Sequence, residues 1–172
     1  MRSLREVAAQ PLGWSQPSLL KRQYELRAGD EVIATLRQKG FGSLALAETA
    51  GGSWTLKRSG FLRPKVSVRS ESETEMAVFK PAWCGTGTLR LADGACYHWQ
   101  NTSFWRSAWA FADEAGNPLV HFKPEAALWK RSAEMKVEAG ARALPDLSLL
   151  AVLGWYLMIL ASDDAAVVAA VS

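Results

Sequence analysis

The sequence predicts a mainly β protein, a closed antiparallel barrel of about 12 strands (six hairpins) around one buried C-terminal apolar helix. Two observations predict it. Units of two alternating apolar runs around a short turn recur from Leu19 to Glu138. A charge-free run, Leu147–Ala161, follows and is apolar on every face of a helical period. A meander of this length exposes its edges unless it closes, and a barrel that wide has a lumen for the helix to fill.

The bulk composition is that of one ordinary globular domain of 172 residues, 49% of them hydrophobic. Residues 1–18 have no strong period and contain two prolines, so we expect an N-terminal arm there. Residues 19–172 are expected to form the barrel, with its central helix at about 146–162. Two cysteines and no apolar leader at the N-terminus favour a cytoplasmic location.

The expected hairpins have turn centres near residues 29, 51, 72, 94 and 116, and a sixth unit is less regular. Four of these turns contain glycine beside aspartate or alanine, and Asp-Gly is a strong hairpin signal. The paired apolar runs are Tyr24–Leu26 with Val32–Leu36, Leu44–Leu46 with Trp54–Leu56, Val66–Val68 with Met76–Val78, Leu89–Leu91 with Tyr97–Trp99, Trp105–Phe111 with Val120–Phe122, and Leu128–Trp129 with Ala133–Val137.

The apolar helix is expected to begin at Pro145 and Asp146, where a carboxylate can accept the free amides of the first turn, and to end at Ser162–Asp164. Gly154 lies in its middle. Either the helix approaches the barrel wall closely there, or the glycine is tolerated without a role. The residues expected to be buried on this helix are Leu150, Leu153, Gly154, Trp155, Leu157 and Met158.

A membrane span is the main alternative for this run. Fifteen residues at about 1.5 Å each make roughly 22 Å, whereas the hydrocarbon layer is about 30 Å thick. Extending the span toward Val171 would place Asp163 and Asp164 in lipid, at a cost of a few kcal/mol each. The length therefore favours a helix buried in protein.

The succession of hairpins from Leu19 to Glu138, followed by the single apolar helix, resembles the tubby C-terminal-like superfamily, which includes the plant LURP-one-related proteins and the phospholipid scramblases. The segments Tyr24–Asp30 and Trp109–Gly116 are most similar to small LURP-one-type proteins. The resemblance implies a barrel around a central helix and, for some members, binding of phosphoinositides or association with membranes. Lipid scrambling is not expected, because the cysteine cluster and the calcium-type acidic loop are missing from this sequence. No motif allows tubby's lipid-binding residues to be carried over.

The sequence carries no motif of a catalytic or metal site. The sequence has no nucleophile elbow, and the glycines of Gly85–Arg90 lack a P-loop lysine. The possible metal ligands Cys84, Cys96, His98 and His121 do not have the spacing of a zinc site. We therefore expect no enzyme activity, no cofactor and no metal.

One basic segment, residues 57–65, is a candidate lipid-binding site. Four cations surround the apolar pair Phe61–Leu62 between the second and third hairpins. Anionic headgroups attract such cations by about 1 kcal/mol each, and an apolar tip can enter the interface. The alternative is a solubilising loop whose aromatic ring folds back on the barrel. The candidate residues are Lys57, Arg58, Phe61, Arg63 and Lys65.

These observations predict a non-enzymatic barrel, cytoplasmic and peripherally bound to membranes, whose partner is an anionic lipid headgroup or another protein. The alternative is a carrier barrel, in which the helix lies outside and the Trp-rich lumen holds an apolar small ligand. Nucleic acid is not expected as a partner, because the net charge of +3 is a small basic excess.

Overall fold

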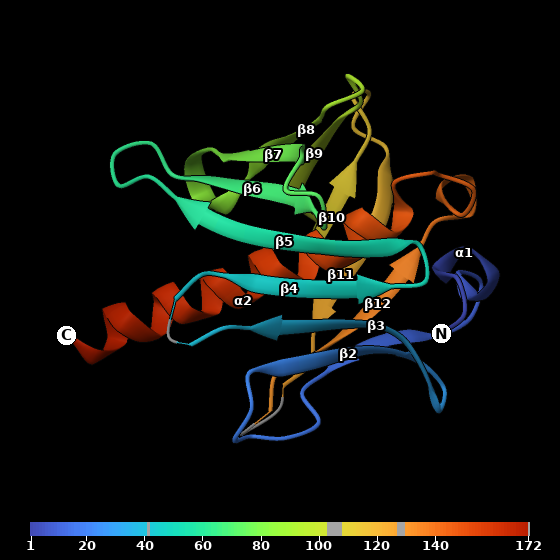
Figure 1. Cartoon of the computed structure of the whole chain (residues 1–172), viewed down its shortest axis with the longest axis horizontal. Coiled ribbons are helices and arrows are strands. Elements are labelled where there is room, and N and C mark those ends of the chain that lie inside the picture. The colour runs from blue at the N-terminus through green and yellow to red at the C-terminus, as the bar shows by residue number, and fades with distance from the viewer. Residues whose placement is uncertain (41, 103–107, 127–129, 172) are drawn as a thin grey trace.

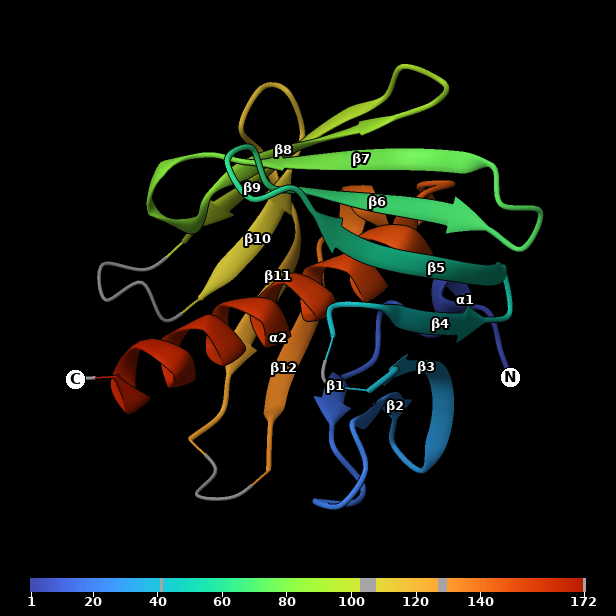
Figure 2. The same ribbon diagram turned by 60° about the vertical axis from the view of Figure 1, so that its left-hand side comes forward.

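The computed structural model describes residues 1–40, 42–102, 108–126 and 130–171. Twelve antiparallel strands close into a barrel, and the C-terminal helix α2 runs through it (Figures 1 and 2). The predicted fold class is therefore confirmed. The elements are α1 (Leu4–Val7), β1 (Leu12–Ser15), β2 (Gln23–Ala28), β3 (Glu31–Gln38), β4 (Ala45–Thr49), β5 (Gly52–Ser59), β6 (Lys65–Ser70), β7 (Glu75–Pro81), η1 (Trp83–Gly85), β8 (Gly87–Leu91), β9 (Cys96–Asn101), β10 (Trp109–Ala112), β11 (Pro118–Pro124), β12 (Ser132–Val137), η2 (Ala139–Ala141) and α2 (Leu147–Ala170).

The first five predicted hairpins are present, with turns where the sequence places them. Gly29, Gly94 and Gly116 have φ angles of 58°, 96° and 86°. These are left-handed conformations that glycine adopts without a steric penalty. The glycines therefore mark the turns because the tight reversal of the chain needs them there.

The N-terminal segment was predicted to be an arm outside the barrel. That prediction was wrong for residues 12–15, which form strand β1 of the barrel. Trp14 of β1 lies opposite Leu26 of β2 on one side and opposite Ala133 of β12 on the other. This short strand closes the cylinder by joining its first hairpin to its last strand. Four residues between prolines are too few to show a period, so only the long-range pairing with two strands identifies them as a strand.

The sixth predicted unit contributes one strand, β12, which pairs with β11 and β1. Its expected first half, Leu128–Trp129, lies outside the described residues, as do Trp105 and Ser107 of the fifth hairpin. The barrel reaches twelve strands because β1 supplies the strand that a sixth hairpin was expected to supply.

The lumen is filled by the first part of α2. As predicted, the buried residues among the inward-facing side chains of the strands include Leu150, Leu153, Gly154, Trp155 and Leu157. Met158 was expected to be buried but is partly exposed, because it lines an open pocket beside Pro124 and Arg131, whereas the next two residues of the helix are buried. In the carrier alternative the helix lies outside the barrel and a ligand fills the lumen. The structure instead has α2 in that space.

Gly154 is the point of closest approach between the helix and the wall. A Cβ atom added there would lie 2.3 Å from Cζ of Phe122 on β11. Atoms of real side chains do not approach so closely, so the helix can lie against this ring only where it has no side chain. The first of the two interpretations of Gly154 is confirmed.

The predicted start of the helix is confirmed, since Asp146 is its N-cap residue, but the capping role of the Asp146 side chain and the predicted C-terminal end need correction. The Asp146 side chain makes no capping hydrogen bond, and instead its Oδ2 accepts one from the Tyr97 hydroxyl at 2.8 Å. At the other end the helix continues past Ser162–Asp164 to Ala170, since both aspartates are held by arginines of the barrel rim. By length and composition α2 is long and apolar enough to cross a membrane, and no other described helix has this property.

Candidate functional site

The two ends of the barrel differ. Because the strands form a meander, alternate connections lie at opposite ends. We call one end the loop face, formed by the described residues of segments 16–22, 39–44, 60–64, 82–86 and 125–131 together with residues 162–171 of the outgoing helix. Figure 1 shows α2 leaving the barrel at this end, where the β3–β4 and β5–β6 connections also lie. The opposite end, which carries the hairpin turns, is the turn face.

Exposed apolar side chains gather on the loop face. Among the described residues, every large hydrophobic side chain that is exposed lies there, apart from Met1 and Met76. A folded chain normally scatters such residues singly over its surface, so this concentration on one end indicates a contact surface. The members are Leu19, Leu20, Phe61, Leu62, Trp83, Val167, Val168 and Val171.

Charge is also divided between the two ends. The loop-face connections and the strand ends next to them carry cations that have no ion pair within the described part of the chain, namely Lys21, Arg37, Lys39, Lys57, Arg63, Lys65, Lys80, Lys123 and Lys130, together with the unpaired acid Glu125. The turn face instead carries acids in most of its hairpin turns, namely Asp30, Glu31, Glu71, Glu73, Asp93, Asp113 and Glu114. A molecule polarised in this way is oriented by an anionic surface, with its loop face toward it.

The β5–β6 loop projects its apolar tip into solvent. Phe61 is 98% exposed and Leu62 is 88% exposed. Gly60 makes the turn with a φ of 88°, where an added Cβ would lie 2.5 Å from the Arg63 carbonyl oxygen. The alternative in which the aromatic ring folds back on the barrel is therefore wrong.

The structure does not bring all the predicted lipid-binding residues together. Phe61 and Arg63 lie at the exposed tip of the loop. Lys57 and Lys65 lie on the barrel wall, where they line two separate grooves. Arg58 turns the other way and is bound to the outgoing helix, so it is not available to a headgroup.

Arg58 belongs to a set of ion pairs that we call the exit collar, formed by Arg22, Arg58, Arg131, Asp163 and Asp164. The guanidinium of Arg58 donates to both carboxylate oxygens of Asp164, at 2.7 and 3.0 Å. Asp163 accepts from Arg131 at 2.7 Å and also from Arg22. These bonds join three parts of the barrel rim to α2, and so they fix the direction in which the helix leaves the lumen.

A tyrosine on α2 adds to this attachment. The Tyr156 hydroxyl donates to the Ser43 carbonyl oxygen and accepts from the Arg58 amide at 3.1 Å. Burial raises the pKa of this phenol to about 12, so it stays a donor at any physiological pH. The β3–β4 loop and the end of β5 are thus held to α2.

The acidity of Asp163 makes the collar sensitive to low pH. Burial acts to raise the pKa of this carboxyl, but the hydrogen bond from Arg131 and the charges of both arginines outweigh it and hold the pKa below its usual value. A carboxyl with a depressed pKa in the folded state stabilises the protein above its unfolded pKa, and this stabilisation is lost as the pH falls through the folded pKa.

We expect Asp163→Asn to lower the free energy of unfolding by about 1–2 kcal/mol at neutral pH, because two partly buried arginines lose a charged acceptor. The difference from wild type should stay nearly constant above the unfolded carboxyl pKa of about 3.9, and shrink as the pH falls below that value and through the lower folded pKa. Denaturant unfolding at several pH values measures it. Asp164→Asn is the control, since that carboxylate is more exposed and should matter less. A difference that stayed constant with pH would contradict the assignment.

Sequence reasoning missed much of the apolar surface. Leu20 is 97% exposed and Trp83 is 92% exposed, each in a different loop-face connection. A signal was present, since both are large apolar residues within connecting segments, where polar residues are the norm. Each alone is unremarkable, and only the fold shows that they share one face with Phe61.

The chemistry of the candidate ligands for a metal is unremarkable. Nowhere in the described residues do three His, Cys, Asp or Glu side chains gather in a way that could hold a metal ion. Cys84 is exposed and Cys96 is half-buried, and both are free thiols. His98 Nδ1 lies 3.4 Å from the Thr88 hydroxyl, and His121 Nε2 lies 2.9 Å from Glu138.

Comparison of the chain with protein-family models, with curated proteins and with solved structures finds no match in any of the three. The resemblance to tubby-like barrels therefore stays a prediction from the sequence.

Proposed function

We propose that this protein is a non-enzymatic barrel that binds reversibly to anionic membrane surfaces through its loop face. The observation that supports this most is the gathering of the exposed apolar residues and of most unpaired cations of the described chain at one end of the barrel, with the acidic turns at the other. In a cytoplasmic protein, this face would meet the anionic lipids of the inner leaflet.

The energetics fit reversible binding. Phe61, Leu62 and Trp83 each gain about 1.5–3 kcal/mol if their side chains become fully buried, and partial insertion into the interface yields part of that. Each nearby cation adds about 1 kcal/mol on an anionic surface at low salt. Ordering and orienting the protein at the surface costs several kcal/mol, so the net affinity is moderate and decreases with ionic strength.

The test is sedimentation with vesicles of phosphatidylcholine, with and without phosphatidylserine. We expect wild type to bind only the anionic vesicles, and to dissociate as salt is raised. Phe61→Ser/Leu62→Ser should weaken binding at least about tenfold, because the tip loses its apolar insertion. Lys21→Glu/Arg63→Glu should weaken it comparably, through charge.

The variants avoid Arg58, since its loss would disturb the exit collar and the direction of α2. Arg142→Glu is the matched control, because it reverses an exposed charge at the turn face. It should bind as wild type does, and all variants should keep the wild-type melting temperature. Failure of wild type to sediment with anionic vesicles at low salt would overturn the proposal. The loop face would then be better explained as a surface for a protein partner.

A further inference from the structure

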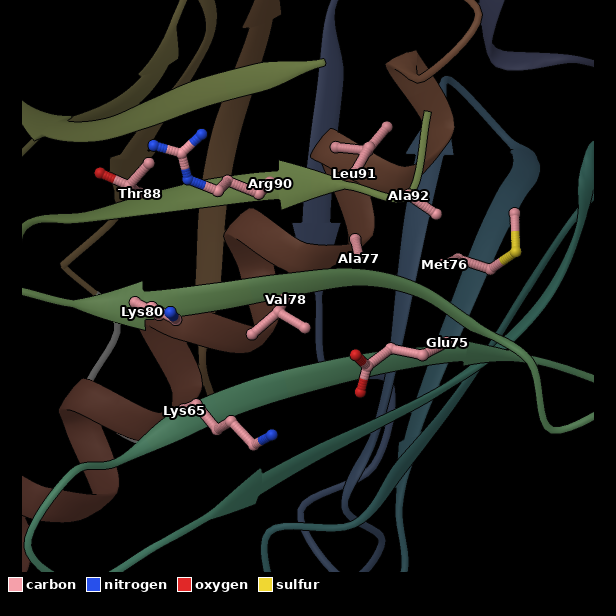
Figure 3. Close-up of a pocket in the computed structure, with 10 residues that line it drawn as sticks. All are labelled: Lys65, Glu75, Met76, Ala77, Val78, Lys80, Thr88, Arg90, Leu91 and Ala92. Atoms are coloured by element: carbon pink, nitrogen blue, oxygen red, sulfur yellow. The ribbon is translucent and has the colours of Figure 1, made fainter. Parts of the chain in front are cut away.

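A groove runs along the outer wall of the barrel over β6, β7 and β8, with a volume of about 410 Å³ (Figure 3). Its two ends differ in character. Lys65, Lys80 and Arg90 rise from the three strands at one end, while Met76 and Ala92 lie toward the other. The full lining is Lys65, Glu75, Met76, Ala77, Val78, Lys80, Thr88, Arg90, Leu91 and Ala92.

Strand pairing places these cations close together. Lys80 lies directly opposite Thr88, and Val78 lies directly opposite Arg90. Lys65 is one residue beyond the pair Val66–Phe79, which places it across from Lys80 on the same face. Like charges opposite each other destabilise a sheet by up to about 1 kcal/mol, so this arrangement has a cost in the free protein.

The cations have no partner that would neutralise them. None of Lys65, Lys80 and Arg90 makes an ion pair or a side-chain hydrogen bond to any other described residue. Glu75 is the acid among the lining residues, and it makes no such bond with them either. The neighbouring groove differs in its arginine, since Arg69 is paired with Glu73 at 3.5 Å, although Lys39 and Lys57 in its lining are also without an ion pair among the described residues.

We propose that this groove binds a phosphate monoester. The planar guanidinium of Arg90 can donate two parallel hydrogen bonds to phosphate oxygens, and the two lysines supply compact positive charge from the adjacent strands. The Thr88 hydroxyl is a further donor. His98 lies 3.4 Å from Thr88 Oγ1, so the tautomer with a proton on Nδ1 donates to this hydroxyl and leaves the hydroxyl proton for the phosphate.

The position of the groove connects it to the loop face. Lys65 begins β6 and Lys80 is next to the end of β7, so both lie where the wall meets the loop face. The inference rests on the proposed membrane function to the extent that the phosphate belongs to a lipid headgroup. A free phosphorylated metabolite presents the same chemistry, and the experiment distinguishes the two sources.

The experiment is calorimetric titration of the full chain with inorganic phosphate and with inositol hexakisphosphate, using sulfate as a control for nonspecific anion binding. We expect wild type to bind the hexakisphosphate more tightly than sulfate. Lys80→Gln/Arg90→Gln should weaken that binding at least about tenfold, since charge-assisted bonds are lost. Arg2→Gln/Arg142→Gln, which removes two exposed charges at the turn face, is the matched control and should bind as wild type does. Equal binding by wild type and by Lys80→Gln/Arg90→Gln would overturn the inference.

A vesicle experiment then separates this inference from the proposed function. Vesicles of equal charge carry either phosphatidylserine or a phosphatidylinositol phosphate. Preference for the phosphoinositide, lost in Lys80→Gln/Arg90→Gln, identifies a lipid headgroup as the ligand. Binding to both vesicles alike, with no binding of soluble phosphates, would overturn the phosphate site and leave the membrane function standing. Binding of soluble phosphates without any vesicle binding would overturn the membrane function and assign the groove to a free phosphorylated compound.

Discussion

Trp155→Asp should prevent the protein from folding. The Trp155 side chain is 2% exposed and lies in the lumen, stacked on Trp14 at 5.7 Å between ring centroids and edge-on to Tyr24 at 5.6 Å. Truncating a buried tryptophan costs about 3–5 kcal/mol, and burying an unpaired carboxylate costs several more. The sum is comparable to the whole free energy of unfolding of a domain of this size, about 5–15 kcal/mol.

The measurement is soluble yield together with circular dichroism and a thermal melt. Val167→Asp is the matched control, because it puts the same charge on the same helix at a residue that is 65% exposed. It should fold with a melting temperature close to that of wild type. If Trp155→Asp were also soluble and melted cooperatively near the wild-type temperature, α2 would have to lie outside the lumen.

Gly154→Leu should lower the free energy of unfolding by about 3 kcal/mol or more. The Phe122 ring occupies the space that the new side chain needs, with its Cζ 2.3 Å from an added Cβ. The ring cannot easily move aside, because it is fully buried and lies 5.6 Å from the Trp99 ring. Overpacking a tight core usually costs about 1–3 kcal/mol, and this site has less room than most. Leucine's better helix propensity offsets only about 1 kcal/mol.

A double-mutant cycle tests the cause. Phe122→Ala alone should cost about 3–5 kcal/mol, because it leaves a cavity beside the helix. Adding Gly154→Leu should fill part of that cavity. The free energy of unfolding lost in the double variant should therefore be smaller, by more than about 1 kcal/mol, than the sum of the losses in the two single variants. Denaturant unfolding of all four proteins measures the coupling. Simple additivity would show that the two residues do not compete for the same space.

The strands and turns could be read from the sequence because their causes are local. Alternating apolar residues define which side of each strand faces inward, and Gly29, Gly94 and Gly116 supply the backbone conformations of the turns. The strand β1 could not be read in this way. It is short, and it is held by β2 and β12, one of which lies at the far end of the chain.

The candidate site was predictable only in part, for a related reason. The sequence shows that the segment around Phe61 is basic and apolar, and the structure leaves Phe61 and Arg63 exposed. It does not show that Arg58 is committed to Asp164, because that pair spans 106 residues. Nor does it show that Lys65 faces Lys80, which depends on strand register.

From the sequence alone, the protein is determined to be a meander of hairpins with an apolar helix too hydrophobic to face water, because periodicity and turn chemistry act between neighbouring residues. Only the tertiary structure decides which end of the barrel gathers the exposed apolar residues, which cations are paired, and how the cylinder closes. Those properties depend on contacts between residues far apart in the chain, and such contacts cannot be predicted from a local sequence pattern.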